Sequence, residues 1–342
     1  MFKIRYWKKL LAFEYPFTIS KGTKTHQPIF VVELEWRGIK AYGEAPAISY
    51  YNITIDQMAE DLTAKIKFVE GFSFTEPKRF WHFLHHLFPK NPFLVCALDM
   101  AGWDLFAKIR NKPLYAIWNL NPLQSPITDY TIGIDALELM LEKIKQHPAP
   151  VYKIKVGNED DLNSLIQIRM HTEAILRIDA NAGWQLEQAK SMLPTLERIG
   201  IELIEQPFAK DAFEETKLFA GLTPIPVIAD ESCVGIADIE KCSSVFDGIN
   251  IKLTKSSGIT PAIDMIKKAR QHGLKIMLGS MNESTIGTAA LAHLAPMIDY
   301  LDADGPLLLK EDLANGLRYE DFQLLPSALP GLGIQIIPHE IN

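Results

Sequence analysis

The spacing of apolar and polar residues changes near residue 128 and divides the chain into two kinds of structure. Before this point, residues 30–36 (FVVELEW) predict a β-strand, and Arg37-Gly38 turns the chain into a partner strand. Helical periodicity then predicts three helices, over residues 55–69, 77–87 and 94–109. The first part of the chain is therefore expected to be an α+β unit.

Beyond residue 128, short apolar runs alternate with amphipathic stretches that have helical spacing. The apolar runs predict eight strands, at residues 130–134, 151–156, 175–179, 201–205, 226–230, 248–252, 275–279 and 300–302. One helix between them is well marked, because Thr260 can cap it, Pro261 suits its first turn and Gly273 suits its end. Repeated strand–helix units predict parallel strands that close into a barrel.

The predicted fold class is α/β, a modified (β/α)7β TIM-like barrel with an N-terminal α+β capping domain. The last strand is followed by Pro306 and a tail rich in proline and glycine, where a regular barrel would have an eighth helix. We expect a capping domain at residues 1–125, a catalytic barrel at 126–310, and a C-terminal segment at 311–342 that folds back on the cap and completes it.

Composition indicates which binding partners and which cellular compartment to expect. The net charge is −7 and no Lys/Arg-rich run offsets it, so nucleic acid is not an expected partner. Three cysteines without CxxC spacing favour a reducing cytoplasm. The basic N-terminus alternates like a strand and is not followed by a cleavage site, and no apolar run is long enough to span a membrane.

Ionisable residues stand at the carboxyl ends of the predicted barrel strands, where barrels of this type hold their functional groups. They are Lys153, Lys155, Asp179, Glu205, Asp230, Lys252, Asp302 and Asp304. Each has an ordinary explanation alone, since a strand lysine is often solvated and an aspartate often caps a helix or forms a turn. The ordered set on successive strands favours a functional site.

Asp179, Glu205 and Asp230 end three consecutive strands and would bring three carboxylates into one sector. Like charges at short range repel unless a cation lies among them. All three are hard oxygen ligands without a nearby His or Cys, which favours one Mg²⁺ per subunit, with Mn²⁺ as a substitute.

Lys155 and Lys252 end the second and sixth strands, which are four apart in a ring of eight. We therefore expect their amines on opposite sides of the barrel mouth, on the two faces of a carbon next to a metal-bound carboxylate. One lysine can remove the α-proton while the other returns a proton to the opposite face. Lys153 shares a strand face with Lys155 and is expected to help lower its pKa.

These motifs resemble the enolase superfamily, specifically the muconate lactonizing enzyme subgroup. The matching motifs are KIK at 153–155, DAN at 179–181, EQP at 205–207, DES at 230–232 and NIK at 250–252, with GEAP at 43–46 in the capping region. The resemblance covers nearly the whole chain. It implies Asp179, Glu205 and Asp230 as Mg²⁺ ligands, Lys155 and Lys252 as acid and base, and Lys153 as a contact of the substrate carboxylate.

Within the subgroup, Asp302-Ala303-Asp304 resembles the D-x-D of the dipeptide epimerases of the L-Ala-D/L-Glu type, where the pair binds the α-ammonium of the dipeptide. Ser280, Met281 and Glu283 match the motif of the seventh strand, although Glu283 alone could be a first-turn acid of a helix. The resemblance implies an isomerase of cell-wall peptide metabolism. It would transfer protons at the α-carbon of the C-terminal residue of an Ala-Glu or Ala-Ala type dipeptide, through an enediolate.

The N-terminal loop departs from that family pattern, because residues 17–24 contain no arginine to bind a side-chain carboxylate of the substrate. Lys21 and Lys24 are the candidates to replace it, without the bidentate grip of a guanidinium. A small or apolar second residue in the dipeptide therefore stays open.

Two alternatives stay open at this stage. The chain could be another two-lysine member of the subgroup, such as an o-succinylbenzoate synthase, an N-succinylamino acid racemase or a cycloisomerase, whose substrates lack a free ammonium. It could also be a barrel that only binds a carboxylate ligand. The resemblance further implies a homo-oligomer.

Overall fold

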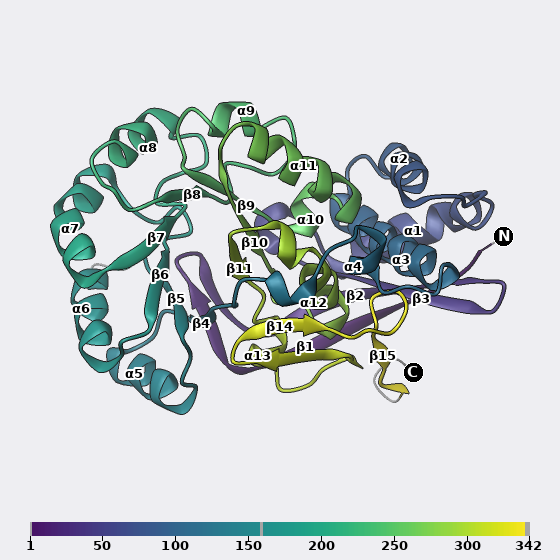
Figure 1. Cartoon of the computed structure of the whole chain (residues 1–342), viewed down its shortest axis with the longest axis horizontal. Coiled ribbons are helices and arrows are strands. Elements are labelled where there is room, and N and C mark those ends of the chain that lie inside the picture. The colour runs from purple at the N-terminus through teal and green to yellow at the C-terminus, as the bar shows by residue number, and fades with distance from the viewer. Residues whose placement is uncertain (1, 158–159, 339–342) are drawn as a thin grey trace.

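The computed structural model describes residues 2–157 and 160–338, and Figure 1 shows an N-terminal antiparallel unit beside a parallel barrel. The N-terminal sheet has the order β1-β2-β3, with β1 at Lys3–Ile19, β2 at Gly22–Trp36 and β3 at Ile39–Pro46. β1 and β2 form a long hairpin whose register shifts between Ala12 and Phe17. β2 begins well before the predicted residue 30, because pairing with β1 extends it beyond its apolar run.

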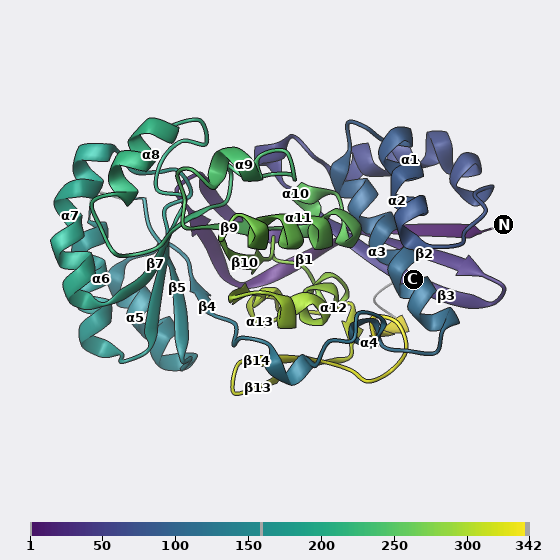
Figure 2. The same cartoon turned by 45° about the horizontal axis from the view of Figure 1, so that its top comes forward.

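Three helices cover this sheet: α1 at Ile55–Glu70, α2 at Pro77–Leu87 and α3 at Pro92–Ile109 (Figure 2). They confirm the three predicted helices within two residues at each end. The Thr54 side chain caps α1 by accepting from Gln57 N, and a proline opens each of the other two. α3 is apolar on nearly all sides because it packs against β2, β3 and the barrel helices α10 and α11.

Eight parallel strands in consecutive order form the barrel, and an isolated bridge between Thr128 and Leu301 joins the first to the last. The strands are β4 Tyr130–Ile132, β5 Val151–Lys155, β6 Ile175–Asp179, β7 Ile201–Glu205, β8 Val227–Ala229, β9 Gly248–Ile251, β10 Lys275–Gly279 and β11 Tyr300–Asp302. The predicted (β/α)7β fold is confirmed. Four strands have the predicted bounds, and the others are shorter by one or two residues.

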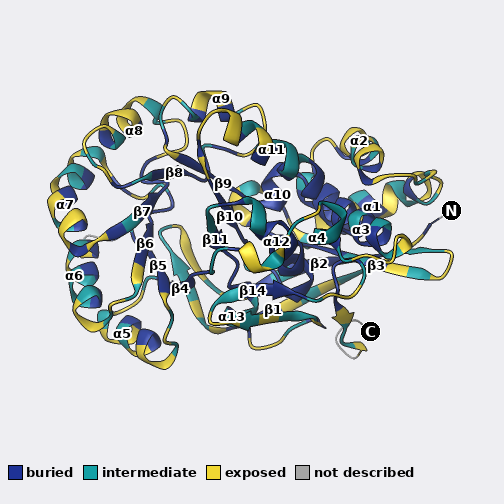
Figure 3. Ribbon diagram, viewed as in Figure 1, coloured by how far each residue is buried: buried dark blue, intermediate teal, exposed yellow. Residues whose placement is uncertain are grey.

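The helices between the strands lie outside the barrel, and most of them turn an exposed face to solvent, whereas α10 and α12 are buried throughout (Figure 3). They are α5 Leu137–Gln146, α6 Asp161–His171, α7 Leu186–Ile199, α8 Phe213–Ala220, α9 Ile239–Cys242, α10 Leu253–Ser256, α11 Ile259–Gln271 and α12 Thr285–Leu294. After β11 comes a single turn, α13 at Gly305–Leu308. The predicted absence of a regular eighth helix thus agrees with the described part of the chain.

The prediction that Thr260 caps α11 is wrong. The N-cap residue is Gly258, and Thr260 lies in the first turn. Thr260 donates from its backbone N (2.9 Å) and its hydroxyl (2.8 Å) to the carboxylate of Asp99 on α3. The N-terminus of this barrel helix is therefore capped by a side chain of the capping unit, which sequence spacing along α11 could not indicate.

The C-terminal segment contains the short strands β12 Ala314–Asn315, β13 Leu317–Glu320, β14 Gln323–Pro326 and β15 Gln335–Ile336. It reaches α3, where Asp104 Oδ1 accepts from Leu332 N at 2.8 Å, and it contacts α4 (Leu114–Ile117) through Leu114 N and Gly331 O. The predicted boundaries at 125/126 and 310/311 stay predictions, and residues 339–342 of the predicted tail lie outside the described residues. No helix in the described ranges is long and apolar enough to cross a membrane.

Candidate active site

The register of the barrel strands places the predicted catalytic layer at one level. Lys155 on β5 is directly opposite Asp179 on β6, which is opposite Glu205 on β7. Asp230 follows β8 and Lys252 follows β9, each one residue beyond its strand. All five side chains are buried. β5 and β9 are four strands apart in the ring, so the two lysines enter from opposite sides of the barrel.

A cavity lies above this layer, between the barrel mouth and the β1–β2 hairpin. Its wall contains eight of the predicted site residues: Lys155, Lys252, Asp230, Asp302, Ser280, Met281, Lys21 and Lys24. The other five, Lys153, Asp179, Glu205, Glu283 and Asp304, are buried and lie outside the wall. The structure thus brings the predicted set together in two shells around one cavity.

Each predicted metal ligand is in contact with an ammonium group. Lys155 Nζ lies 2.6 Å from Asp179 Oδ2, and Lys252 Nζ lies 2.9 Å from Asp230 Oδ2. Lys153 Nζ lies 2.7 Å from Glu205 Oε2, 3.2 Å from Asp179 Oδ2 and 2.6 Å from Asp302 Oδ2. Lys153 is therefore the shared counter-ion of three carboxylates and is fully buried beneath the cavity.

These contacts shift the protonation equilibria of the layer. Burial alone would raise the pKa of Asp179, but Lys155 and Lys153 outweigh it and hold that pKa at about 2. Burial likewise opposes ionisation of Asp230, and Lys252 and Lys255 keep its pKa well below the usual range. Burial and the charge of Asp179 raise the pKa of Glu205 to about 7. The layer is thus a set of tightly coupled charges.

Lys252 differs from the sequence expectation for a catalytic base. Burial would lower the pKa of its ammonium, but Asp230 and Glu205 outweigh burial and raise it above the ordinary value. The sequence argument predicts a lowered pKa for a lysine that acts as a base. The difference arises because the carboxylates of this layer stabilise the ammonium form.

The donor set fits a hard divalent cation. Asp179, Glu205 and Asp230 offer carboxylate oxygens from three neighbouring strands. Glu205 Oε2 is buried and accepts no hydrogen bond within the described residues, because Lys153 Nζ approaches it outside hydrogen-bonding geometry. Asn250 Nδ2 donates to the other oxygen, Oε1, at 2.7 Å and fixes the carboxylate plane. A buried carboxylate oxygen without a donor is chemically suited to bind a cation.

A second acidic group lies next to this set. Oxygens of Asp129, Asp302 and Asp304 all lie within 4.8 Å of one another. All three members accept hydrogen bonds: Arg177 Nη1 donates to Asp129 Oδ2 at 3.0 Å, Thr131 N to Asp304 Oδ2 at 2.6 Å and Lys153 Nζ to Asp302 Oδ2 at 2.6 Å. Burial, and then the charge of Asp302, raise the pKa of Asp304 to about 7.

The three predicted ligands do not draw that close together in the described chain, because lysine ammonium groups lie among them. Asp179 and Asp230 have lowered pKa values, whereas the pKa values of Asp129 and Asp304 are raised by burial and by Asp302. Each group therefore holds both kinds of carboxyl, because the pKa of Glu205 in the first is also raised and that of Asp302 in the second is lowered.

The loop after β10 is fixed from the capping unit. Met281 N donates to Glu283 Oε2 at 2.6 Å, which shapes the loop on the cavity side. Glu44 of β3 accepts from Ser284 N (2.8 Å), from the Ser284 hydroxyl and from Gly287 N (3.0 Å). Glu44 therefore caps the N-terminus of α12, as Asp99 does for α11, and holds the segment with Ser280 and Met281 in place.

The two hairpin lysines have different surroundings. Lys21 Nζ lies 3.2 Å from Glu231 Oε1 and 3.9 Å from the centre of the Tyr50 ring. Lys24 Nζ has no carboxylate within 4 Å among the residues that the structure describes, and it donates to Gln27 Oε1 at 3.5 Å. Burial, followed by the charges of Lys252 and Lys155, lowers the pKa of Lys24. Lys24 is thus a half-buried cation directed at the catalytic layer.

Several residues of the site were not found from the sequence. The cavity wall also contains Phe17, Ile19, Ile48, Tyr50, Tyr51, Thr131, Asn181, Glu231 and Asn282. Lys255, behind Asp230, was missed as well. Glu231 and Asn181 belong to the DES and DAN motifs and could have been suspected from them. Tyr50 and Tyr51 lie in a short turn after β3 that carries no recognisable pattern, and Phe17 lies near the end of β1.

Comparison with known families covers most of the chain. Residues 2–118 match the family described as mandelate racemase / muconate lactonizing enzyme, N-terminal domain. Residues 135–340 match the family described as enolase C-terminal domain-like.

Related proteins carry epimerase names. An L-Ala-D/L-amino acid epimerase of Maribacter sp. is 43% identical over 330 residues, which are 96% of this chain and 98% of the relative. A protein of the same name from Flavobacterium johnsoniae is 41% identical, covering 96% of this chain and 97% of the relative.

Solved structures agree with these relatives. A substrate-liganded L-Ala-D/L-Glu epimerase from Bacillus subtilis superposes with a TM-score of 0.91 at 30% identity, covering 97% of this chain and 98% of its own. A dipeptide epimerase from Cytophaga hutchinsonii, complexed with Mg and D-Ala-L-Val, has a TM-score of 0.92 at 28% identity, covering 99% of this chain and 96% of its own.

Proposed function

This chain belongs to the mandelate racemase / muconate lactonizing enzyme family of the enolase superfamily, and from this premise we propose that it is a magnesium-dependent dipeptide epimerase. It is an isomerase that inverts the α-carbon of the C-terminal residue of a dipeptide. The observation that carries the proposal is the pair Lys155 and Lys252, which enter one cavity from opposite strands with a carboxylate layer between them. Two relatives named L-Ala-D/L-amino acid epimerase, at 43% and 41% identity, support it.

We assign Asp179, Glu205 and Asp230 as the residues that hold Mg²⁺, with Mn²⁺ as a possible replacement. Bound there, the ion would neutralise the carboxylates that now stabilise the lysine ammonium groups, and would stabilise the charge that develops on the substrate carboxylate. The proposal is supported by the lowered pKa values of Asp179 and Asp230, and by the buried Oε2 of Glu205, which accepts no hydrogen bond within the described part of the chain.

The two lysines perform the proton transfers. One, as a neutral amine, takes the α-proton, and the electron pair of the broken C–H bond moves into the carboxylate to give an enediolate. The other, as an ammonium, returns a proton to the opposite face of the same carbon. The number of protons is conserved in one turnover, and exchange with solvent restores the two protonation states. Lys153, beneath the layer, keeps a positive charge next to Asp179 and Glu205 throughout.

Asp302 supplies the site for the α-ammonium of the dipeptide. Its carboxylate is ionised, because Lys153, Lys155 and Lys252 outweigh burial and lower its pKa. It lies in the cavity wall, whereas Asp304 is buried outside the wall with its Oδ2 bonded to Thr131 N. Asp302 therefore contacts the ammonium directly, and Asp304 lies behind Asp302, outside the cavity wall. This arrangement favours a dipeptide over substrates that lack a free ammonium.

Lys24 is the hairpin residue that binds a side-chain carboxylate of the substrate. Its ammonium lies in the cavity wall without a carboxylate partner among the described residues, whereas Lys21 is already paired with Glu231. An unpaired, half-buried ammonium gains a counter-ion when an acidic side chain enters. The cavity wall is otherwise apolar or aromatic at Phe17, Ile19 and Tyr51, so uncharged side chains also fit the chemistry.

A dipeptide panel in deuterated water tests the proposal. With Mg²⁺ present, proton NMR should show loss of the α-proton signal of the C-terminal residue in L-Ala-L-X substrates and the appearance of the L-Ala-D-X epimer. N-succinylated amino acids serve as the control without an ammonium and should exchange far more slowly. Absence of exchange in every dipeptide of a broad panel would contradict the proposal.

Two parts of the proposal rest on the sequence. The three free, buried cysteines suit a reducing compartment, so we place the enzyme in the cytoplasm. The family resemblance further suggests a homo-oligomer, which sedimentation analysis of the purified chain would test.

A further inference from the structure

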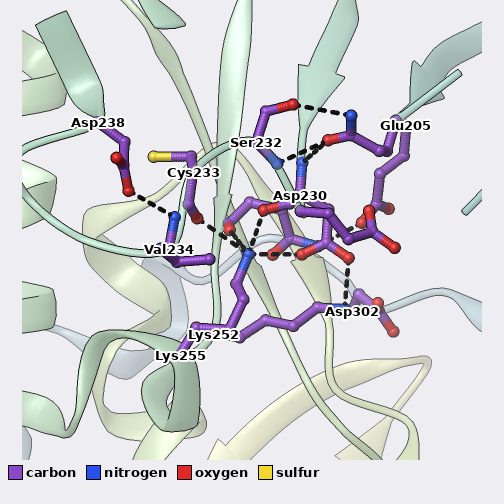
Figure 4. Close-up of polar contacts among 12 residues, drawn as sticks. Glu205, Asp230, Ser232, Cys233, Val234, Asp238, Lys252, Lys255 and Asp302 are labelled. Atoms are coloured by element: carbon purple, nitrogen blue, oxygen red, sulfur yellow. Dashed lines mark hydrogen bonds and ion pairs between the residues drawn. The ribbon is translucent and has the colours of Figure 1, made fainter. Parts of the chain in front are cut away.

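Lys255 on α10 is a buried lysine that the proton-transfer chemistry does not use. Its side chain is 1% exposed. Its ammonium lies 2.5 Å from both Asp230 Oδ1 and Asp230 O, and 3.1 Å from Cys233 O and Asn250 O. Figure 4 shows these dashed contacts converging on the single nitrogen behind Asp230. Its partners are oxygens of Asp230, of the loop that follows Asp230 and of the end of β9, next to Lys252.

The two oxygens of Asp230 have different partners as a result. Oδ1 is held by Lys255, and Oδ2 lies 2.9 Å from Lys252 on the cavity side. The backbone behind this carboxylate is held too, because Lys255 also bonds Asp230 O, and Gln206 Oε1 accepts from Asp230 N at 2.9 Å. Rotation of the carboxylate would break the contact with Lys255, so the side chain has one supported orientation.

The same ammonium joins three segments of backbone. Cys233 O belongs to the loop after β8, Asn250 O belongs to β9, and Lys255 itself lies on the turn that follows Lys252. Asn250 also donates from its side chain to Glu205. Lys255 is thereby connected to two of the three carboxylates that we assign as metal ligands, and to the backbone next to one catalytic lysine.

Electrostatics alone would make this lysine a disadvantage for a metal site. A buried positive charge beside a metal ligand repels a second cation, and burial of an ammonium is costly unless its hydrogen bonds are satisfied. Lys255 satisfies its three donors with four oxygens. Its charge and its geometry therefore predict opposite effects on cation binding, and this difference in sign can be measured.

We propose that Lys255 is a positioning residue that orients Asp230 for Mg²⁺ and, through the backbone of the loop after β8, sets the distance between Asp230 and Lys252. It touches neither the substrate nor the reacting carbon. This inference rests on the proposed function, because it takes Asp230 as a metal ligand.

Isothermal titration of Mg²⁺ into the purified full chain tests the inference. Lys255→Met removes the ammonium and keeps the length of the side chain, so Asp230 loses its support and the Mg²⁺ dissociation constant should rise at least tenfold. Lys255→Gln keeps N–H donors without the charge and should lie between Lys255→Met and the wild type. Unchanged or tighter Mg²⁺ binding by Lys255→Met, as expected if only its charge mattered, would overturn the inference.

Lys143→Met is the matched control. Lys143 is also a buried lysine, with a side chain 10% exposed against 1% for Lys255, and it pairs with Asp135 at 2.9 Å, away from the metal ligands. Its replacement should leave the Mg²⁺ dissociation constant within about twofold of the wild type. A tenfold loss in this variant as well would show that removal of a buried lysine acts generally on the fold, and would overturn the specific role of Lys255.

The wild type separates this inference from the proposed function. If the wild-type chain bound no Mg²⁺ and exchanged no α-proton, the proposed function would fail before Lys255 was considered. If the wild type binds Mg²⁺ and Lys255→Met binds it equally well, the function stands and the positioning role fails. Circular dichroism first establishes that each variant is folded, and Lys255→Gln alone decides the question if Lys255→Met does not fold.

Discussion

The catalytic layer and the β1–β2 hairpin face each other across the cavity, and their charged side chains differ in how completely they are paired. Each carboxylate of the layer, Asp179, Glu205 and Asp230, is buried and has an ammonium within 3 Å. On the hairpin, Lys21 has one partner and Lys24 has no carboxylate within 4 Å among the described residues. A fixed charge layer suits one unvarying reaction, and an incompletely paired wall suits selection among substrates.

Removal of the metal should have the largest effect on activity, and it tests the catalytic layer alone. Dialysis against EDTA should abolish epimerisation of all dipeptides alike, and Mg²⁺ should restore it, because three buried carboxylates need a cation to bind the substrate carboxylate between them. Activity is measured by NMR before and after Mg²⁺ is added back. Full activity of the metal-free protein, verified by elemental analysis, would contradict the assigned role of the layer.

Acid should lower the free energy of unfolding through His293 on α12, which belongs neither to the catalytic layer nor to the hairpin. Its Nδ1 accepts from Tyr115 N at 3.2 Å, and its Nε2 lies 3.1 Å from Leu332 O, so the neutral ring satisfies both neighbours. Burial lowers its pKa to about 4, against 6.5 for an exposed ring. The unfolded chain consequently binds more protons between these values, and stability falls as pH decreases from 6.5 to 4, by about 3 kcal/mol in total.

Unfolding measurements distinguish a loss of stability in acid from a loss of activity caused by protonation of the catalytic layer. Urea unfolding at pH 7 and pH 4.5 is compared between the wild type and His293→Gln, which retains a donor and an acceptor. The wild type should lose more stability than the variant over this interval. Equal losses would mean that His293 does not titrate in the folded state as its surroundings indicate.

Lys24 tests the hairpin as the selective wall. Lys24→Met should lower kcat/KM for L-Ala-L-Glu roughly 10- to 100-fold, mainly through KM, because a partly buried charge pair is lost. The value for L-Ala-L-Leu should change less than about threefold. Steady-state kinetics on both substrates checks this, and equal losses on the two would assign Lys24 to the common reaction and remove the contrast between the regions.

Lys21 should show the smallest effect and serves as the comparison for Lys24. Its ammonium already contacts Glu231 and the Tyr50 ring, and its side chain is 33% exposed. Lys21→Met should therefore change kcat/KM by less than about fivefold, with similar factors for acidic and apolar substrates. A selective loss on L-Ala-L-Glu would instead identify Lys21 as the carboxylate contact.

The two regions were also unequally predictable from the sequence. Barrel strands buried on both faces are continuous apolar runs that end in a charge, so β6, β7, β10 and β11 were located to the residue. The hairpin was predicted only in part, as a strand-like N-terminus and as β2 from residue 30 onward, because residues 22–29 are mostly polar and their strand structure depends on pairing with β1. The partners of Lys21 and Lys24 could not be assigned from spacing for the same reason.

Polar contacts between residues far apart in the sequence could not be predicted either. Asp99 and Glu44 cap the helices α11 and α12 from the capping unit, and each is separated by more than 150 residues from the groups it accepts from. Lys255 is only three residues from Lys252, yet nothing in its spacing reveals that it bonds Asp230. Local pattern thus indicated the residues to which we assign the chemistry, and tertiary structure was needed to find those that contact them from distant elements.

The most direct test of the opposed lysines is α-proton exchange in deuterated water by Lys155→Met and Lys252→Met, each given L-Ala-L-X and L-Ala-D-X separately. Each variant should lose epimerisation by about 10³-fold or more and keep exchange for only one of the two epimers, with opposite preference in the two variants. Exchange of the same epimer by both variants, or epimerisation at the wild-type rate by either, would contradict the placement of one lysine on each face of the substrate.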